Sequence, residues 1–270
     1  MTEPKVVTSL SNDRIKAIRA LEMRKARKET GLFVAEGASI LVTARERGQT
    51  PATLVYRTGS AESGIARGLV GSALAAGAEV LEVSAAILEK LAAKDNPQSM
   101  LGVFKQMWAP APKPNEVRRD ATWLALEDIR DPGNLGTIIR TADAVGVAGI
   151  ILGGTCCDPF AHECVRATMG SIFSVPLVRM PKDQLIPLIG NWPGEAVGTH
   201  LASPHDFRKV NFRAPVMLVM GGEGPGLSED VSKACRRLVR IPMAGTLDSL
   251  NLAIATALAL YQIQGPRLGL

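Results

Sequence analysis

Short and nearly uninterrupted apolar runs recur through the second half of this chain, and they constrain its fold more than any other feature. Helical patterns separate most of these runs. A strand buried on both faces lacks the polar alternation of a half-exposed strand, so the runs are typical of a parallel sheet covered by helices on both faces. We therefore predict an α/β fold here, with strands at residues 122–126, 149–152, 174–178, 196–199, 216–220 and 239–241.

A proline-rich segment precedes these strands. Residues 106–116 hold three prolines at alternate positions, a composition that favours extended chain and cannot continue a helix or a central strand. A chain of 270 residues is long enough for two separate cores. We therefore predict a first domain over residues 1–105, a linker over 106–117 and a second domain over 118–270.

The first domain also alternates strands and helices, which predicts a smaller α/β unit. Short apolar runs bounded by glycine or polar residues predict strands at residues 31–37, 53–56 and 79–83. Helical patterns separate them at residues 38–47 and 62–75.

A basic amphipathic helix is predicted over residues 12–29. Its apolar residues recur at helical spacing, and Asn12 or Ser11 can cap its start. Its cations, offset only by Asp13 and Glu22, are Arg14, Lys16, Arg19, Arg24, Lys25, Arg27 and Lys28. Such a block attracts a phosphate backbone, although a merely solvated helix face carries the same kind of charge. Composition alone leaves both interpretations open.

The overall composition is that of a folded globular protein, with 46% hydrophobic and 21% charged residues. The longest apolar run, 250–263, is shorter than the roughly 18 to 20 residues that a bilayer span needs. No apolar core follows the first charges near the N-terminus, so we predict neither a signal peptide nor a membrane anchor. We expect a cytoplasmic location.

Three of the four cysteines, Cys156, Cys157 and Cys164, lie close to His162, which raises the question of a metal site. Adjacent cysteines point apart in an extended chain, and no C-x-x-C pair is present to complete a zinc site. We therefore expect reduced, buried thiols at these positions and at Cys235, and no metal.

Three segments of the second domain combine turn residues with isolated polar side chains. The first, D-P-G-N-L-G-T-I-I-R-T-A at 131–142, follows a strand and starts a helix, with Asn134 as a candidate N-cap and Arg140 on the helix. The second, M-G-G-E-G-P-G-L at 220–227, has neither the Walker pattern nor the dinucleotide-binding pattern. Glycines after a parallel strand let backbone approach a ligand closely, so this segment predicts a small-molecule pocket.

The third segment is R-I-P-M-A-G-T-L-D-S-L-N-L-A at 240–253, a strand, a loop and an apolar helix whose first turn holds Ser249 and Asn251. Capping accounts for one of these polar residues. Asn251 falls where the pattern predicts burial, so it needs a hydrogen-bond partner or a functional role.

In order, spacing and identity, the three segments resemble the three motifs of the SpoU (TrmH-like) RNA ribose methyltransferases of the SPOUT superfamily. Residues 158–160 and 166–173 are similar to the segment between those motifs, and residues 33–37 and 83–103 are similar to the ribosomal-L30e-like substrate-binding domain of the family. The resemblance implies a C-terminal α/β-knot domain with a deep trefoil knot, which general rules against threaded chains would have rejected. It also implies a homodimer formed through the knotted domain.

The resemblance further implies S-adenosylmethionine as the cofactor and a ribose 2′-hydroxyl of structured RNA as the methyl acceptor. By matched position the catalytic residues are Arg140, Asn134, Glu223, Ser249 and Asn251. Those at the cofactor are Gly221, Ile241 and Leu250, with Thr199, Gly222, Leu227 and Met243 as neighbours. The expected RNA contacts are Arg14, Lys16, Arg24, Lys25, Arg27, Lys28 and Arg166.

A ribose hydroxyl is a poor nucleophile at neutral pH, so its proton must be removed or its oxyanion stabilised. The resemblance assigns hydroxyl activation to Arg140. Because a guanidinium keeps its proton, we expect Arg140 to hold the adjacent phosphate and stabilise developing negative charge. Asn134 is expected to orient Arg140 or the ribose, Ser249 and Asn251 to supply polar contacts at the same centre, and Glu223 to position the substrate or Arg140.

Two alternatives remain beside methylation of ribosomal RNA, which the separate N-terminal domain favours. One is the same chemistry on transfer RNA, which the motifs do not distinguish. The other is an RNA-binding or assembly factor whose catalytic pocket has decayed. The presence of Asn134, Arg140, Glu223 and Asn251 argues against the second alternative.

Overall fold

The computed structural model describes residues 3–92, 98–247 and 249–269. The chain forms two compact units. The first comprises Met1–Gln106 together with Asp158–Ser174, and the second comprises Met107–Cys157 and Val175–Leu270. The boundary between the two units at Gln106 coincides with the start of the proline-rich segment, whose prolines cannot continue a helix or a central strand.

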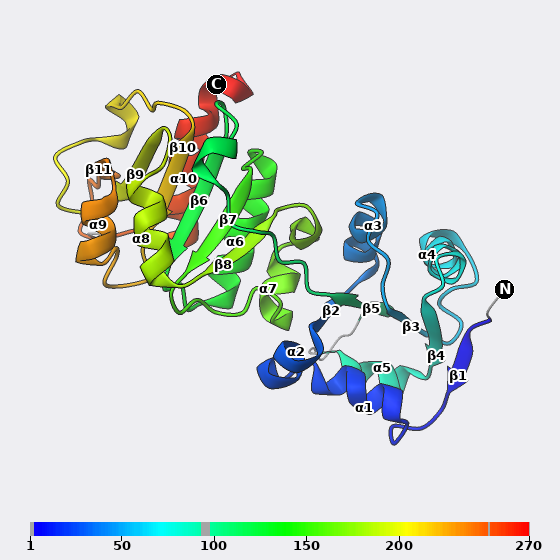
Figure 1. Cartoon of the computed structure of the whole chain (residues 1–270). Coiled ribbons are helices and arrows are strands. Elements are labelled where there is room, and N and C mark those ends of the chain that lie inside the picture. The colour runs from blue at the N-terminus through cyan, green and yellow to red at the C-terminus, as the bar shows by residue number, and fades with distance from the viewer. Residues whose placement is uncertain (1–2, 93–97, 248, 270) are drawn as a thin grey trace. The chain divides into compact units, whose positions relative to one another are not determined.

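The first unit contains a five-stranded mixed sheet in the order β1-β4-β3-β5-β2 (Figure 1). β5 is antiparallel to both of its neighbours, and the other pairs are parallel. The strands are β1 (Lys5–Val7), β2 (Leu32–Glu36), β3 (Thr53–Arg57), β4 (Glu79–Val83) and β5 (Met100–Lys105). The three predicted strands are confirmed, whereas β1 and β5 were not predicted.

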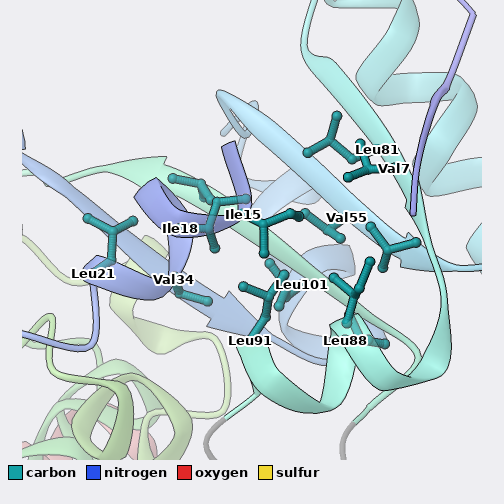
Figure 2. Close-up of a cluster of buried hydrophobic side chains, with 13 residues drawn as sticks. Val7, Ile15, Ile18, Leu21, Val34, Val55, Leu81, Leu88, Leu91 and Leu101 are labelled. Atoms are coloured by element: carbon teal, nitrogen blue, oxygen red, sulfur yellow. The ribbon is translucent and has the colours of Figure 1, made fainter. Parts of the chain in front are cut away.

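Helices cover both faces of this sheet (Figure 1). α3 (Ala38–Glu46) and α4 (Gly64–Ala75) pack together on one face, and α1 (Asp13–Ala20) and α5 (Ala85–Leu91) on the other. Ile15, Ile18 and Leu21 are buried in a cluster with side chains from the strands and α5 (Figure 2). Burial of the apolar face of α1 therefore holds the basic N-terminal region in place.

The predicted helix over residues 12–29 is two helices. α1 ends at Ala20 and α2 (Arg24–Thr30) begins after a short break. Nη1 of Arg27 donates to the carbonyl oxygens of Leu21 (2.8 Å) and Glu22 (2.7 Å), groups that the break leaves without helical partners. The side chain of Arg27 thus satisfies backbone groups that one continuous helix would have satisfied itself.

Residues 158–174 pack within the first unit, although the sequence placed them inside the second domain. They form α7 (His162–Ala167) and the short 3-10 helix η2 (Ser171–Phe173). The rings of Phe160 and Phe33 are 4.9 Å apart between centroids, and those of Phe173 and Phe104 are 4.7 Å apart. Aromatic packing therefore holds this segment in the first unit. No periodicity in the sequence predicts this placement.

The second unit contains a six-stranded sheet in the order β11-β9-β10-β6-β7-β8, and every pair in it is parallel (Figure 1). The prediction of a parallel sheet is confirmed. Its strands are β6 (Thr122–Glu127), β7 (Gly149–Gly153), β8 (Leu177–Met180), β9 (Glu195–Thr199), β10 (Val216–Met220) and β11 (Arg237–Val239). β8 lies later and β11 earlier than the predicted runs 174–178 and 239–241.

Helices cover both faces of this sheet too. α6 (Pro132–Ala144) packs against α10 (Leu252–Leu268), and α8 (Lys182–Gly190) packs against α9 (Glu229–Ala234). Two 3-10 helices, η1 (Pro114–Glu116) and η3 (Phe207–Lys209), complete the unit. In the described part of the chain, every helix is too short or too polar to cross a membrane.

Candidate active site

The three motif segments follow the carboxyl ends of three strands of the parallel sheet, of which β10 and β6 are adjacent and β11 is separated from β10 by β9. The first comes after β6, the second after β10 and the third after β11. Parallel strands end at one edge of a sheet, and loops at that edge form the usual ligand site of such folds. The topology therefore brings together segments that are far apart in the sequence, such as those of Asn134 and Asn251, which are 117 positions apart.

The first segment turns from β6 into α6 through a capped helix start. Oδ1 of Asp131 accepts a hydrogen bond from the backbone N–H of Asn134 (2.6 Å), and Pro132 occupies the first helical turn. The prediction that Asn134 is the N-cap is wrong, since Asp131 has that role. The side chain of Asn134 is therefore available for contacts elsewhere.

Asn134 joins the three motifs through its side-chain amide. Its Nδ2 donates to Oε1 of Glu223 (3.0 Å), and its Oδ1 accepts from Nδ2 of Asn251 (3.0 Å). Oε2 of Glu223 also lies 3.5 Å from the backbone N–H of Arg130. Both ends of the Asn134 amide are thus oriented by side chains from the other two motifs.

Asn251 is the N-cap of α10. Its Oδ1 accepts from the backbone N–H groups of Ala253 (2.9 Å) and Ile254 (3.3 Å). The helix begins at Leu252, so the prediction that it already includes Ser249 is wrong. Ser249 is exposed and makes no hydrogen bond to another described residue. One asparagine therefore both caps the helix and reaches the Asn134 amide.

The glycine loop of the second motif is shaped by contacts with the protein's own backbone. A Cβ on Gly221 would lie about 2.0 Å from the carbonyl carbon of Gly226, and a Cβ on Gly222 would lie 2.8 Å from the carbonyl oxygen of Asp128. Gly224 and Gly226 have φ angles of +92° and +70°. The sequence interpretation of these glycines as room for a ligand therefore needs correction, since Gly221 and Gly222 allow the loop to close.

A buried carboxylate that the motif comparison did not single out holds this loop in place. Glu127, only 1% exposed, ends β6. Its two oxygens accept from the backbone N–H (2.9 Å) and hydroxyl (2.6 Å) of Ser228, which directly follows the glycine loop. Lys182 Nζ lies 2.5 Å from the same carboxylate. A charged residue at the end of the apolar run Leu124–Leu126 was the signal that could have identified it.

The segment 241–250 has the properties that an adenosine group needs. Within residues 241–247 and 249–250, no backbone N–H or carbonyl bonds to another described residue. Met243 and Leu250 are 37% and 38% exposed, and Ile241 is half-buried. Free backbone donors and acceptors beside accessible apolar side chains fit a cofactor bound mainly by backbone.

The two remaining predicted cofactor residues, Thr199 and Leu227, differ in which of their atoms a ligand can reach. Thr199 ends β9, is half-buried and lies beside Met220, with its Oγ1 3.5 Å from the sulfur. Leu227 is 6% exposed, and its side chain belongs to the core on the α8–α9 face of the sheet. Only its backbone is therefore available to a ligand.

Arg140 does not join the Asn134 amide network. It lies six residues beyond Asn134 on α6, which corresponds to about 9 Å along the helix axis and a rotation of about 120° from it. Its side chain is exposed and makes no hydrogen bond or ion pair with another described residue. The expectation that Asn134 or Glu223 orients Arg140 is therefore not met in this chain.

The predicted RNA contacts lie in the first unit. Arg24, Lys28 and Arg166 are exposed with no ion pair to another described residue, and Lys25 is 3.9 Å from Glu29. The remaining predicted contacts, Arg14, Lys16 and Arg27, are paired.

Arg14 pairs with Glu79, and Lys16 lies 3.3 Å from Asp13. Arg27 is 5% exposed and forms a buried ion pair with Asp158, so its assignment to RNA is wrong.

Cys156, Cys157 and Cys235 are free thiols and only half-buried, whereas Cys164 is fully buried. Burial raises the pKa of the Cys156 thiol to about 11 and that of the Cys235 thiol to about 12. In the described part of the chain, no three His, Cys, Asp or Glu side chains gather as a metal-ligand set. With these raised pKa values, the thiols of Cys156 and Cys235 are protonated at neutral pH.

Two family sequence profiles match this chain. That of the SpoU rRNA methylase family covers residues 121–261, and that of the MRM3-like substrate binding domain covers residues 12–102. Each match lies within one of the two predicted domains, and the proline-rich segment falls between them.

Named relatives match the chain over most of its length. The 23S rRNA (uridine(2479)-2'-O)-methyltransferase of Streptomyces viridochromogenes is 31% identical, covering 88% of this chain and 84% of that protein. The 23S rRNA (guanosine(2553)-2'-O)-methyltransferase RlmP of Bacillus subtilis is 26% identical, covering 97% and 100%. The crystal structure of an AdoMet-bound rRNA methyltransferase from Sinorhizobium meliloti has a TM-score of 0.87 and 41% identity, covering 97% of this chain and 98% of that one.

Proposed function

This chain belongs to the SpoU rRNA methylase family, and we propose that it transfers a methyl group from S-adenosylmethionine to a ribose 2′-hydroxyl of ribosomal RNA. The observation that carries the proposal is the amide network in which Asn134 contacts Glu223 and Asn251, one residue from each motif. Two relatives that span most of the chain are named for this reaction on 23S rRNA, which favours ribosomal over transfer RNA.

The cofactor would be held by the segment 241–250 and the neighbouring ends of β9 and β10. The free backbone groups of this segment would bind its polar edges, and Met243 and Leu250 would contact the adenine. When bound, S-adenosylmethionine supplies a methyl group that is already activated by its sulfonium. The protein must therefore orient the ribose hydroxyl and manage the negative charge on its oxygen.

Asn134 is suited to orient the ribose. Its amide cannot rotate without losing the hydrogen bonds to Glu223 and Asn251, so it presents a fixed polar group at the carboxyl edge of the sheet. A group positioned before the substrate arrives does not need to reorganise during the reaction. Glu223 and Asn251 act as positioning residues for this amide, and the exposed hydroxyl of Ser249 is available to the substrate.

Arg140 is the cation proposed to meet the RNA. Its guanidinium is exposed and has no ion pair among the described residues, so it is free to bind a phosphate. Because a guanidinium remains protonated, its contribution is electrostatic stabilisation of the phosphate and of the developing oxyanion, not removal of the proton.

The first unit is proposed to bind the RNA. Arg24, Lys28 and Arg166 remain available for phosphate contacts, and so does Lys25, whose exposed partner Glu29 is 3.9 Å away. Arg14, Lys16 and Arg27 have closer ion pairs. The match to the MRM3-like substrate binding domain supports this assignment.

The second unit is proposed to form a homodimer through its knotted region. Ile254, Leu258 and Tyr261 are 52%, 43% and 44% exposed, and their spacing places them on one face of α10. Exposed apolar side chains in a continuous stripe are typical of a protein interface. The stripe begins beside Asn251, so a second subunit bound there would cover one side of the candidate active site.

The decisive experiment is tritium transfer from methyl-labelled S-adenosylmethionine to total RNA from cells that lack this enzyme, followed by mapping of 2′-O-methyl groups. We expect label at one ribose of ribosomal RNA. Label on transfer RNA would overturn the proposed substrate, and label on a base would overturn the proposed acceptor. The absence of label from every RNA would overturn the enzymatic assignment.

A further inference from the structure

β11 is the terminal strand of the sheet in the second unit (Figure 1). A basic groove lies beside this strand. Two adjacent surface hollows share Pro204, His205 and Arg237 as lining residues. The first is also lined by Lys209 and Arg240, and the second by Lys233 and Arg236. We call this surface the β11 groove.

The charge of the segments that form the groove is strongly one-sided. Residues 200–213 and 232–242 contain one acidic residue, Asp206, against seven Lys and Arg residues. The seven are Arg208, Lys209, Arg213, Lys233, Arg236, Arg237 and Arg240. Besides the block of cations near the N-terminus, the chain therefore has a second basic cluster. Its residues come from separate stretches of the sequence and come together only in the fold.

Only some of these cations are neutralised within the protein. Arg208 pairs with Asp206 (2.6 Å), Lys233 with Glu229 (2.5 Å) and Arg237 with the buried Glu195 (2.6 Å). The side chains of Lys209, Arg236 and Arg240 are exposed and form no ion pair with any described residue. The groove therefore presents three uncompensated positive charges to solvent.

The walls of the groove are held rigidly. The backbone N–H of Arg240 donates to the carbonyl of His205 (2.8 Å), and the N–H of Phe207 donates to the carbonyl of Arg240 (3.1 Å). The hydroxyl of Ser203 donates to the carbonyl of Leu238 (2.7 Å). Because the backbone is fixed in this way, binding an extended anion costs little ordering of the chain.

The groove leads directly to the candidate cofactor segment. Pro242 lines the first hollow and lies between Ile241 and Met243, both predicted at the cofactor. His200 lines the second hollow and follows Thr199 at the end of β9. An RNA strand lying along the groove would therefore pass beside the methyl-transfer centre.

We propose that the β11 groove binds the phosphate backbone of the substrate RNA next to the reacting nucleotide. The proposal rests on the proposed RNA substrate and adds a contact surface within the methyltransferase unit itself. An open, rigid groove with several uncompensated cations suits an extended polyanion better than a compact ligand, which needs enclosure. The first unit and the β11 groove then share the task of binding RNA.

The test compares two charge-reversal variants of the full-length protein. The groove variant carries Lys209→Glu, Arg236→Glu and Arg240→Glu. The control carries Lys113→Glu, Arg118→Glu and Arg119→Glu, which are exposed cations of the same unit outside the groove. Each set of three reversals changes the formal net charge by six, from +5 to −1.

Binding of a fluorescein-labelled single-stranded RNA of mixed sequence is measured by anisotropy over a range of NaCl concentrations. This probe does not depend on knowing the methylated nucleotide. Each lost phosphate contact lowers the slope of log K against log salt by about 0.7, so we expect the groove variant to lose about two units of slope. We expect its affinity to fall at least tenfold below that of the control, with S-adenosylmethionine binding and thermal unfolding unchanged.

Equal losses in both variants would show a net-charge effect and overturn the proposal. An unchanged affinity in the groove variant would overturn it as well, because the groove cations would then not contact the RNA. The proposed function is tested separately, because it requires methyl transfer by the wild-type protein. If the wild-type protein transfers no methyl group but the groove variant still binds RNA more weakly than the wild type, only the enzymatic assignment is refuted.

Discussion

The guanidinium of Arg27 and the carboxylate of Asp158 form a buried ion pair between residues 131 positions apart, with Nε and Oδ2 separated by 2.8 Å. Both side chains are less than 10% exposed. The pair connects α2 to the start of the segment 158–174 inside the first unit. Its role is therefore structural, although both residues lie in stretches that sequence comparison linked to function.

We predict that Arg27→Ala lowers the free energy of unfolding by about 3–5 kcal/mol, because it leaves the buried Asp158 carboxylate unpaired. Chemical denaturation monitored by circular dichroism measures the loss. Lys28→Ala, an exposed neighbour on the same helix, should change the stability by less than about 0.5 kcal/mol. Equal stability of the two variants would show that the ion pair does not hold the segment.

Reversal of the exposed cations of α2 should weaken RNA binding and leave the stability nearly unchanged, which is the opposite of the loss of stability expected for Arg27→Ala. In the triple variant Arg24→Glu, Lys25→Glu and Lys28→Glu, we expect RNA binding to weaken and its salt dependence to decrease by about two units of slope, with the stability nearly unchanged. Anisotropy titrations with labelled RNA provide the measurement. Retained RNA affinity would remove α2 from the binding surface.

Glu127 is predicted to control the position of the glycine loop. Glu127→Gln weakens the hydrogen bonds to Ser228 and leaves Lys182 without its buried partner, so the loop should lose its fixed placement. We expect the dissociation constant for S-adenosylmethionine to rise on the order of tenfold, a cost of about 1.4 kcal/mol. Isothermal titration calorimetry measures this change.

The matched control is Glu229→Gln, which removes an exposed carboxylate paired with Lys233 on the nearby helix α9. Exposed pairs of this kind contribute little, so cofactor affinity should stay at the wild-type value. A similar loss in both variants would mean that Glu127 affects the site only through general stability.

Arg140→Ala is predicted to lower kcat by at least two to three orders of magnitude, because the proposed function assigns stabilisation of the developing oxyanion to this charge. The side chain is exposed and unpaired in the described structure, so stability and cofactor affinity should be unchanged. Arg140→Lys should restore only part of the rate, since a lysine does not reproduce the planar guanidinium. Single-turnover kinetics give the comparison, and wild-type turnover in Arg140→Ala would exclude the residue from the mechanism.

Asn251→Ala removes both the cap of α10 and the hydrogen bond to Asn134. The cap alone predicts a loss of about 0.5–2 kcal/mol in unfolding free energy. Asn251→Asp keeps the capping oxygen but cannot donate to Asn134, so it should retain the stability and still reduce kcat. Full activity in Asn251→Asp would show that the amide network is not needed for methyl transfer.

Leu258→Glu on the exposed stripe of α10 is predicted to prevent formation of the proposed homodimer. A charge in an apolar interface must be desolvated without a partner, which costs more than such an interface contributes at that position. Sedimentation velocity measures the oligomeric state. Ile65→Glu, at an apolar residue 63% exposed in the first unit, is the control and should leave the proposed dimer intact.

Much of the chain's organisation was determined by the sequence itself. The apolar runs around Thr122–Glu127 and Val216–Met220 predict central parallel strands because only a strand buried on both faces tolerates such a run. The prolines after Gln106 mark the end of the first unit, since they cannot extend a helix or a ladder. Motif order likewise identified Asn134, Glu223 and Asn251 before any coordinates placed them together.

Tertiary structure alone decided which polar side chains are available for function. Arg24 and Arg27 are three residues apart in the same basic run, yet one is exposed and the other pairs with Asp158. Local sequence encodes helix propensity and periodicity, but the partner of a charge is chosen by contacts between distant segments. For the same reason the β11 groove, whose cations come from separate stretches, and the buried Glu127 became recognisable only once the chain was folded.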